Sequence, residues 1–203
     1  MVGNDIIDLN LADRHAWKRK RYLDKVFTAS EQRLIQNSND PGTLLWILWS
    51  MKESAYKLHV REHFYQALNP TKFLCFFDQE LEFASGDSSQ GRVEGRVRAG
   101  DQVFLTNTIF NQDCIHTLAL INSRVKIQGN MMSGDCPNQL REKLVEALVE
   151  SCSTPSDLTC NEVKFHKDKN GIPFVTDEKR SFSKACSISH HGKFGAFAVV
   201  VQL

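Results

Sequence analysis

Residues 44–60 read LLWILWSMKESAYKLHV, and this stretch decides how the rest of the chain is interpreted. It contains no glycine or proline and predicts one uninterrupted helix. Apolar side chains occur almost all round that helix, so we expect it to be buried on most faces. Lys52, Glu53 and Lys57 lie in its second half and must either emerge at a cleft or find partners inside the protein.

The segments before this helix predict a strand and a shorter helix. Residues 2–9 are mostly apolar and β-branched, as in a first strand. Thr28 and Glu31 form a capping-box pattern that opens a helix. The turn residues 39–42 end it, and Thr43 is the expected N-cap of the long helix.

The remaining chain alternates between strand patterns and one further helix. A polar stretch at 123–135 is the best candidate linker, and Pro137 opens a helix after it. Strands are predicted at 72–77, 92–97, 103–110, 115–121, 162–166, 173–176, 185–189 and 194–201. This order predicts an α+β fold in two unequal halves.

Composition excludes some classes of function. With 25 basic and 24 acidic residues the formal charge is +1, which does not suit nucleic-acid binding as the main activity. The longest strongly apolar run, 44–49, is far too short to cross a membrane. The first residues lack a secretion-signal pattern, and none of the six cysteines forms a C-x-x-C pair, so reduced thiols and a cytoplasmic location are expected.

The long helix carries the first candidate site. Trp49, Glu53 and Lys57 follow one another at steps of four and share one stripe of the helix. A carboxylate and an ammonium would then project side by side. An ordinary intrahelical salt bridge explains the same spacing, and spacing alone favours that explanation.

Asp5 offers a second carboxylate at the first strand. A lone Asp at a strand end is usually a turn former or a cap. Together with Glu53, however, it would make a pair of oxygen ligands of the kind that Mg²⁺ uses alongside substrate phosphates.

Two further segments carry polar chemistry. Residues 187–193 read SISHHGK, whose hydroxyls and imidazoles are good donors to a phosphate, although a structural histidine is the commoner reading. A basic segment at 14–25 is either a solvated helix face or a surface for an acidic partner. The members of that basic segment are Arg14, Lys18, Arg19, Lys20, Arg21 and Lys25.

Taken in order, these segments resemble the 4'-phosphopantetheinyl transferase superfamily. The family signature is a strand with G-x-D and a helix with W-(S/A)-x-K-E-(A/S)-x-x-K. Here the two motifs stand at 2–6 and 49–57, and the helix motif matches at every fixed position. Residues 27–31 are similar to the family's F-(T/S)-x-x-E element. Residues 170–174 and 187–192 are similar to its G-K-P and S-x-S-H segments.

The resemblance implies a reaction. The enzyme would transfer the phosphopantetheine arm of coenzyme A to a serine of an apo acyl or peptidyl carrier protein, with Mg²⁺ as cofactor and 3',5'-ADP as the second product. Asp5 and Glu53 would hold the Mg²⁺, and Glu53 would help to remove the serine proton. Lys57 would stabilise the pyrophosphate, with Lys52 as a further cofactor contact. Ser189 and His190 would bind the 3'-phosphate of the nucleotide.

The chain departs from the family pattern at two positions. Many larger members carry a second acidic ligand where this chain has Ile7, although the compact holo-acyl-carrier-protein synthases also lack it. Asp8 matches an acidic position of those compact enzymes. The lysine of G-K-P is Ile172 here, and Lys167 or Lys169 is the candidate replacement.

The resemblance also implies an architecture. The chain would consist of two family-like α+β halves, 1–125 and 126–203, related by a pseudo-twofold arrangement with the site between them. A monomer is then expected. In the large surfactin-synthetase-activating type the two motif-bearing halves come in the opposite order.

Two other functions stay open at the level of sequence. Ile7 and Ile172 are compatible with a non-catalytic homologue that binds coenzyme A or a carrier protein. A weaker option is an unrelated Mg²⁺-dependent phosphohydrolase. Which carrier protein would be used is not readable from these residues.

Overall fold

The computed structural model describes residues 1–63, 67–78, 90–121, 126–134, 137–150, 163–169, 171–177 and 182–202. Its α-helices are α1 (Lys20–Val26), α2 (Ala29–Asn37), α3 (Pro41–His63) and α4 (Pro137–Glu150), and short 3₁₀ turns lie at Ala16–Lys18 and Pro70–Lys72. The strands are β1 (Val2–Asp8), β2 (Phe73–Phe77), β3 (Gly91–Ala99), β4 (Gln102–Phe110), β5 (Cys114–Leu120), β6 (Lys126–Ser133), β7 (Val163–Lys167), β8 (Pro173–Asp177), β9 (Phe182–His191) and β10 (Phe194–Gln202). The mixed helix and strand content that the sequence predicts is confirmed.

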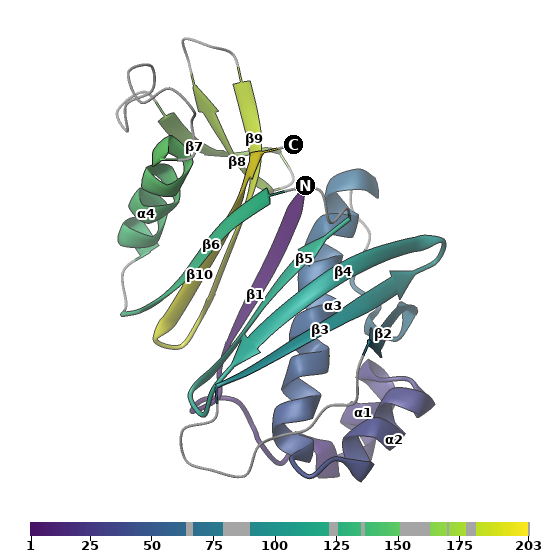
Figure 1. Ribbon diagram of the computed structural model, residues 1–203. Helices are drawn as coiled ribbons and strands as arrows, with labels where there is room; N and C mark the ends of the chain where they lie inside the picture. The colour runs from purple at the N-terminus through teal and green to yellow at the C-terminus, as the bar shows by residue number, and fades with distance from the viewer. Residues whose placement is uncertain are drawn as a thin grey trace.

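The strands form two five-stranded sheets whose described pairings are antiparallel. The first sheet has the order β1-β5-β4-β3-β2 and the second has the order β6-β10-β9-β8-β7. In both sheets, therefore, the first strand in the chain pairs with the last one. Figure 1 shows α3 against the first sheet and α4 against the second.

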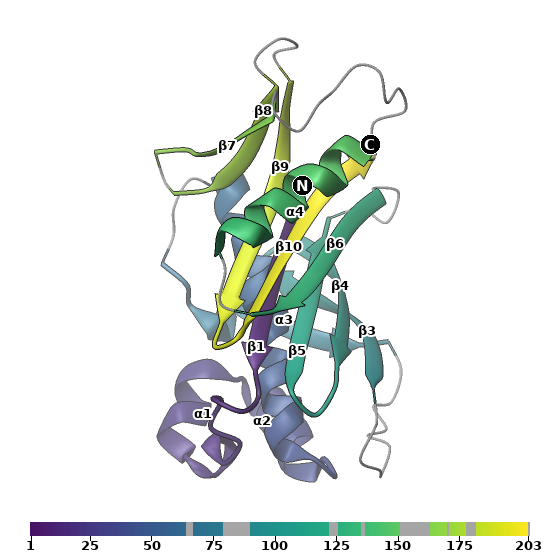
Figure 2. The ribbon, with the colours of Figure 1, turned by 90° about the vertical axis from the view of Figure 1, so that its left-hand side faces the viewer.

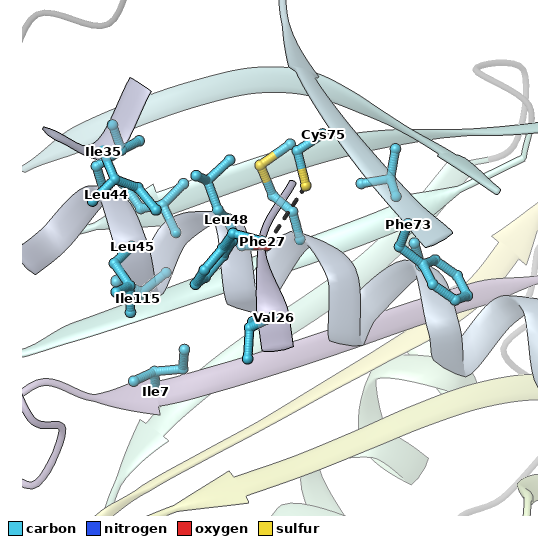
Figure 3. Close-up of a cluster of buried hydrophobic side chains, with 14 of the residues drawn as sticks. Ile7, Val26, Phe27, Ile35, Leu44, Leu45, Leu48, Phe73, Cys75 and Ile115 are labelled. Carbon is cyan, nitrogen blue, oxygen red and sulfur yellow. Dashed lines mark hydrogen bonds between the residues drawn. The ribbon is translucent and has the colours of Figure 1, made fainter. Parts of the chain in front are cut away.

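Helix α3 is the centre of the larger hydrophobic core. Its side chains Leu45, Ile47, Leu48, Met51, Ala55 and Leu58 are fully buried. They belong to one cluster with buried residues of the first sheet, α1 and α2, and Figure 3 labels Leu45 and Leu48 of this cluster near Phe27 and Ile115. This burial on several sides confirms what the apolar residues around the helix predict.

The start of α3 differs from the prediction. The helix begins at Pro41, and the carboxylate of Asp40 accepts the backbone N–H of Thr43 at 3.0 Å. Asp40 therefore caps the helix and Pro41 occupies its first turn, as both residue types prefer. The expectation that Thr43 is the N-cap was wrong. The capping box of Thr28 and Glu31 in α2 is confirmed.

The proposed linker was also wrong over most of its length. Within 123–135, residues 126–133 form strand β6, which pairs along β10. Its polar side chains and Gly129 do not form the apolar pattern that predicts a strand. Strand β6 lies at the edge of its sheet, where polar residues are common. The proposed boundary between residues 125 and 126 stays a prediction, because residues 122–125 are outside the described part of the chain.

Glycine at position 3 has a packing reason. Helix α3 crosses β1 so closely that a Cβ added at Gly3 would lie 2.1 Å from the carbonyl oxygen of Ser54. The hydroxyl of Ser54 also donates to the carbonyl of Thr117 on β5 at 3.1 Å. The glycine of the G-x-D pattern thus brings α3 against β1.

The two sheets meet along β1. Side chains of β9 accept its outward N–H groups: Asn4 N donates to Ser187 Oγ at 3.0 Å, and Asp8 N donates to His191 Nδ1 at 2.8 Å. Apolar clusters around Val2 and Ile6 join β1 to β10. In both Figure 1 and Figure 2 strands β9 and β10 lie alongside β1. We call this junction of β1, β9 and α3 the seam.

Three cysteines lie within the described part of the chain. Cys75, Cys114 and Cys186 are buried and free, as expected for reduced core thiols. Burial raises the pKa of each of these thiols, which makes them unreactive. Cys136, Cys152 and Cys160 are outside that part. None of the described helices combines the length and the apolar character that crossing a membrane requires.

A buried ion pair links α2, α3 and β2. The ammonium of Lys52 donates to both carboxylate oxygens of Glu31 at 2.9 Å, to the carbonyl of Pro70 at 2.9 Å and to that of Phe73. The side chains of Lys52 and Glu31 are only 0% and 2% exposed. Glu31 also accepts the N–H of Cys75 at 2.9 Å. Each charge is therefore offset by several polar partners.

Replacing Lys52 by Met should therefore cost about 3–5 kcal/mol of unfolding free energy, because it leaves the carboxylate of Glu31 buried without its cation. Urea denaturation at pH 7 measures this cost. Lys57→Met, five residues along the same helix but at a 30% exposed side chain, is the matched control and should cost clearly less. Equal losses in the two variants would contradict this role for the buried pair.

Candidate functional site

The charged stripe of α3 faces the seam. The ammonium of Lys57 donates to the carbonyl of Asn4 at 2.7 Å and lies 3.3 Å from Asp5 Oδ1. Asp5 is next along β1, and its side chain is 14% exposed. The structure thus brings Asp5 and Lys57 together from positions 52 residues apart in the sequence. The carboxylate that pairs with Lys57 in this contact belongs to β1 and not to its own helix.

Glu53 lies in the same electrostatic environment. Burial, together with the negative charge of Asp5, raises the pKa of Glu53 to about 7, although Lys57 opposes the shift. Burial also raises the pKa of Asp5, again against the effect of Lys57. Two carboxylates therefore share a poorly hydrated place with one ammonium, an arrangement more typical of functional sites than of surface ion pairs.

These two carboxylates fit a divalent cation that is shared with a substrate. Among the described residues no group of three or more His, Cys, Asp or Glu side chains could hold a metal ion. Mg²⁺ is commonly bound by one or two carboxylates, with water and substrate phosphates completing its shell. Asp5 and Glu53 suit that mode better than a site made by the protein alone. Ile7 is buried in the hydrophobic core that surrounds α3, and its apolar side chain offers no ligand to a metal ion.

Asp8 has a structural role at the turn between β9 and β10. Its carboxylate accepts the N–H of Asn10 at 3.0 Å and that of Lys193 at 3.2 Å. Burial alone would raise the pKa of Asp8, but these hydrogen bonds outweigh it and the pKa is lowered. Gly192 has φ +56°, and a Cβ there would lie 2.3 Å from Asp8 Oδ2, so this turn requires glycine.

Ser189 and His190 lie on opposite faces of β9, because successive side chains of a strand alternate. Ser189 is 7% exposed and faces β1, where its Oγ accepts the amide of Asn4 at 3.0 Å. His190 is exposed and lines a cavity of about 190 Å³. Of the two residues, His190 therefore contributes to the cavity, and Ser189 contributes to the seam.

The cavity beside His190 is basic. Arg141 of α4 and Lys167 of β7 line it, together with Gly171 of the β7–β8 connection and Pro173 of β8. Its other lining residues are Leu140, Phe165 and Ile188. Of the two lysines that could replace the family lysine at position 172, Lys167 lines the cavity and Lys169 does not. Asn170 is outside the described residues.

The structure does not bring Lys52 to this site. The side chain is 0% exposed, and its ammonium is used by Glu31 and backbone carbonyls. The expectation that Lys52 contacts a cofactor therefore does not fit its position. Lys52 and Glu53 are neighbours in sequence and so project about 100° apart around the helix, Lys52 inward and Glu53 toward the seam.

Sequence reasoning missed three residues that the site uses. Asn4 joins Lys57 to Ser189, and Arg141 lines the basic cavity. Arg61, one helical turn after Lys57, hydrogen-bonds to β8 and β9. The repeat of four along Trp49, Glu53, Lys57 and Arg61 was a visible signal for Arg61. Nothing local to the sequence singles out Asn4 or Arg141.

A larger cavity of about 620 Å³ lies along another side of α3. Tyr56, His59, Lys72 and Asp101 are among its lining residues, and none of the carboxylates with a raised pKa belongs to it. Size alone therefore does not identify the site.

Replacing Glu53 by Gln should stabilise the metal-free protein at pH 8 by up to about 3 kcal/mol, because an acid whose folded pKa exceeds its unfolded value destabilises the fold when ionised. The gain should be complete above pH 7 and should disappear as the pH falls through 4.5, below which both states are protonated. Urea denaturation in EDTA at pH 8 and pH 4 measures this. Glu94→Gln, at a 65% exposed side chain, is the control. A gain of the same size at pH 4 would contradict the assignment.

Comparison with known proteins identifies the family of the chain. A family model described as the 4'-phosphopantetheinyl transferase superfamily matches residues 1–102, about half of the chain. The match includes β1 and α3 with Asp5, Glu53 and Lys57, whereas Ser189 and His190 lie beyond it. A comparison with curated proteins found no match. The chain belongs to the 4'-phosphopantetheinyl transferase superfamily.

Proposed function

We propose that this protein transfers 4'-phosphopantetheine from coenzyme A to a serine of an apo acyl or peptidyl carrier protein and releases 3',5'-ADP. Phosphopantetheine transfer is the general chemistry of the superfamily. The observation that carries the proposal is the meeting of Asp5, Glu53 and Lys57 at the seam, where β9 leads on to a basic cavity.

Asp5 and Glu53 are the residues that would hold Mg²⁺. The ion would supply positive charge against the pyrophosphate oxygens of coenzyme A. Lys57 would add a second positive charge on the same group. This ammonium is held by the carbonyl of Asn4, so its direction is fixed before substrate binds.

Glu53 would also accept the proton of the carrier serine. The serine oxygen forms a bond to the phosphorus that carries pantetheine, the bond from that phosphorus to the bridging oxygen breaks, and 3',5'-ADP leaves with the electron pair. The raised pKa of Glu53, about 7, belongs to the metal-free protein, so a bound Mg²⁺ would keep the carboxylate ionised and able to accept this proton near neutral pH.

The basic cavity would take the nucleotide end of coenzyme A. His190, Lys167 and Arg141 give it three donors to the 3'-phosphate. Ser189 would support the same strand from the β1 side through Asn4. Lys167 would thus perform the task of the missing lysine at Ile172.

We also propose that residues 1–125 and 126–203 are two related halves in a pseudo-twofold arrangement within a monomer. The identical strand order of the two sheets supports this, as does the packing of a helix against each sheet. The site would lie between the halves, so one chain would form it without a second copy.

The basic segment of η1 (Ala16–Lys18) and α1 would dock the carrier protein. All six of its basic side chains are exposed: Arg14, Lys18, Arg19, Lys20, Arg21 and Lys25. Arg19 pairs with Asp13 and Lys20 with Asp24, which leaves the local excess mainly on the other four. An acidic carrier surface would complement this charge.

The test of the function is incubation with coenzyme A, Mg²⁺ and a panel of apo carrier proteins, followed by intact-mass measurement of the carrier. The carrier should gain the mass of phosphopantetheine. Asp5→Ala and Glu53→Ala should each reduce transfer by about 10²-fold or more while the protein stays folded. Asp101→Asn, at the 620 Å³ cavity, is the control and should stay active.

Three results would contradict the proposal. Coenzyme A binding without any transfer would identify a non-catalytic binder instead, and release of inorganic phosphate would identify a phosphohydrolase. Full activity of both alanine variants would show that the assigned carboxylates are wrong.

Charge reversal at the basic segment should affect the carrier and not coenzyme A. The double change Arg21→Glu and Lys25→Glu should raise KM for the carrier about 10-fold, with a smaller effect in high salt, and leave KM for coenzyme A within about 2-fold. Steady-state kinetics with each substrate varied in turn measure this. Lys143→Glu on α4 is the control. Equal changes in both KM values would exclude the docking role.

A further inference from the structure

Arg61 joins the catalytic helix to the second half of the chain. It lies on α3, one turn beyond Lys57 and two turns beyond Glu53. Its Nη1 donates to the carbonyl of Pro173 on β8 at 3.2 Å, and its Nη2 donates to the carbonyl of Cys186 on β9. One guanidinium therefore bridges two strands of the other sheet.

The arrangement is a poor way to gain stability. Arg61 is partly buried, and none of the ion pairs among the described residues includes it. Its Nε is buried and, within the same part of the chain, has no hydrogen-bond partner. Burial lowers the pKa of the guanidinium although the negative charge of Asp168 opposes this shift, so desolvation outweighs that attraction. A buried N–H without a partner costs free energy, and so does a desolvated charge whose hydrogen bonds go to backbone carbonyls.

Both acceptors belong to the nucleotide end of the proposed site. Pro173 lines the basic cavity. Cys186 stands four residues before His190, on the strand that carries both Ser189 and His190. Arg61 thus connects the helix that carries Glu53 and Lys57 to β8 and β9, two of the strands whose residues line the cavity where the nucleotide would bind.

We propose that Arg61 is a positioning residue that sets the distance between the pyrophosphate-binding end and the nucleotide-binding end of the coenzyme A site, an inference that rests on the proposed function. Lys57 and His190 come from different halves of the chain, so coenzyme A can contact both only if α3 and β9 keep a fixed spacing. Arginine suits this task because its planar fork presents N–H groups to two acceptors at once, whereas a lysine ammonium is a point charge on a flexible stem.

The test compares Arg61→Gln and Arg61→Lys with the wild type. In each variant KM for coenzyme A should rise about 10-fold, because a small displacement of one substrate contact weakens binding strongly. KM for the carrier should stay within about 2-fold. Calorimetric titration with 3',5'-ADP should show a similar loss of affinity without any need for transfer. Arg92→Gln, at a 65% exposed side chain of β3, is the matched control and should behave as wild type.

A merely structural role gives a different result, because partial unfolding lowers the concentration of active enzyme and hence kcat, with KM unchanged. That outcome would overturn the proposal, and so would wild-type KM and 3',5'-ADP affinity in the folded Arg61→Lys variant. If Arg61→Gln does not fold, Arg61→Lys keeps the charge and decides the question by itself. Failure of the wild type to modify any carrier would instead refute the proposed function. The titration with 3',5'-ADP would still test whether Arg61 positions the nucleotide-binding residues.

Discussion

The outer edge of β1 is the constraint on which the rest of the structure depends. A sheet edge presents unpaired backbone groups that need partners. Here Ser187 and His191 of β9 accept the N–H groups of Asn4 and Asp8, and Lys57 of α3 donates to the carbonyl of Asn4. The same contacts that satisfy this strand therefore bring the two sheets and α3 together, and they place Asp5 where they meet.

The motif on α3 divides its charges between two tasks. Lys52 points inward and, with Glu31, ties α2 and β2 to the helix. Glu53 shares the environment of Asp5, and Lys57 contacts β1. The inward pair fixes how the helix lies in the core, and that position determines where the outward groups emerge. Both carboxylates at the seam carry a raised pKa, which a bound cation would relieve.

Local chemistry explains what could be predicted from sequence. The apolar residues of 44–60 indicated the buried helix, and the capping box of Thr28 and Glu31 indicated the helix before it. Strand β6 was missed because an edge strand needs no alternating apolar pattern. Thr43 was mistaken for the cap because Asp40, directly before a proline, first looked like a residue of the turn.

The site was predictable only in part, because the direction of a side chain depends on tertiary packing. Asp5 and Glu53 were paired as a hypothesis because both offer oxygen ligands, and the structure gives them a common electrostatic environment. Lys52 carries the same charge as Lys57, and only packing shows that it faces inward. Asn4 and Arg141 reach the site because they lie next to residues that are distant in the sequence. A local sequence pattern does not contain this information.

The most direct test of this account is a crystal structure of the protein grown with coenzyme A and Mn²⁺, which replaces Mg²⁺ and gives an anomalous signal. The account predicts an anomalous peak in contact with the carboxylates of Asp5 and Glu53, pyrophosphate oxygens beside Lys57, and the 3'-phosphate beside His190. An anomalous peak away from both carboxylates, or coenzyme A in the cavity beside Tyr56 and His59, would contradict it.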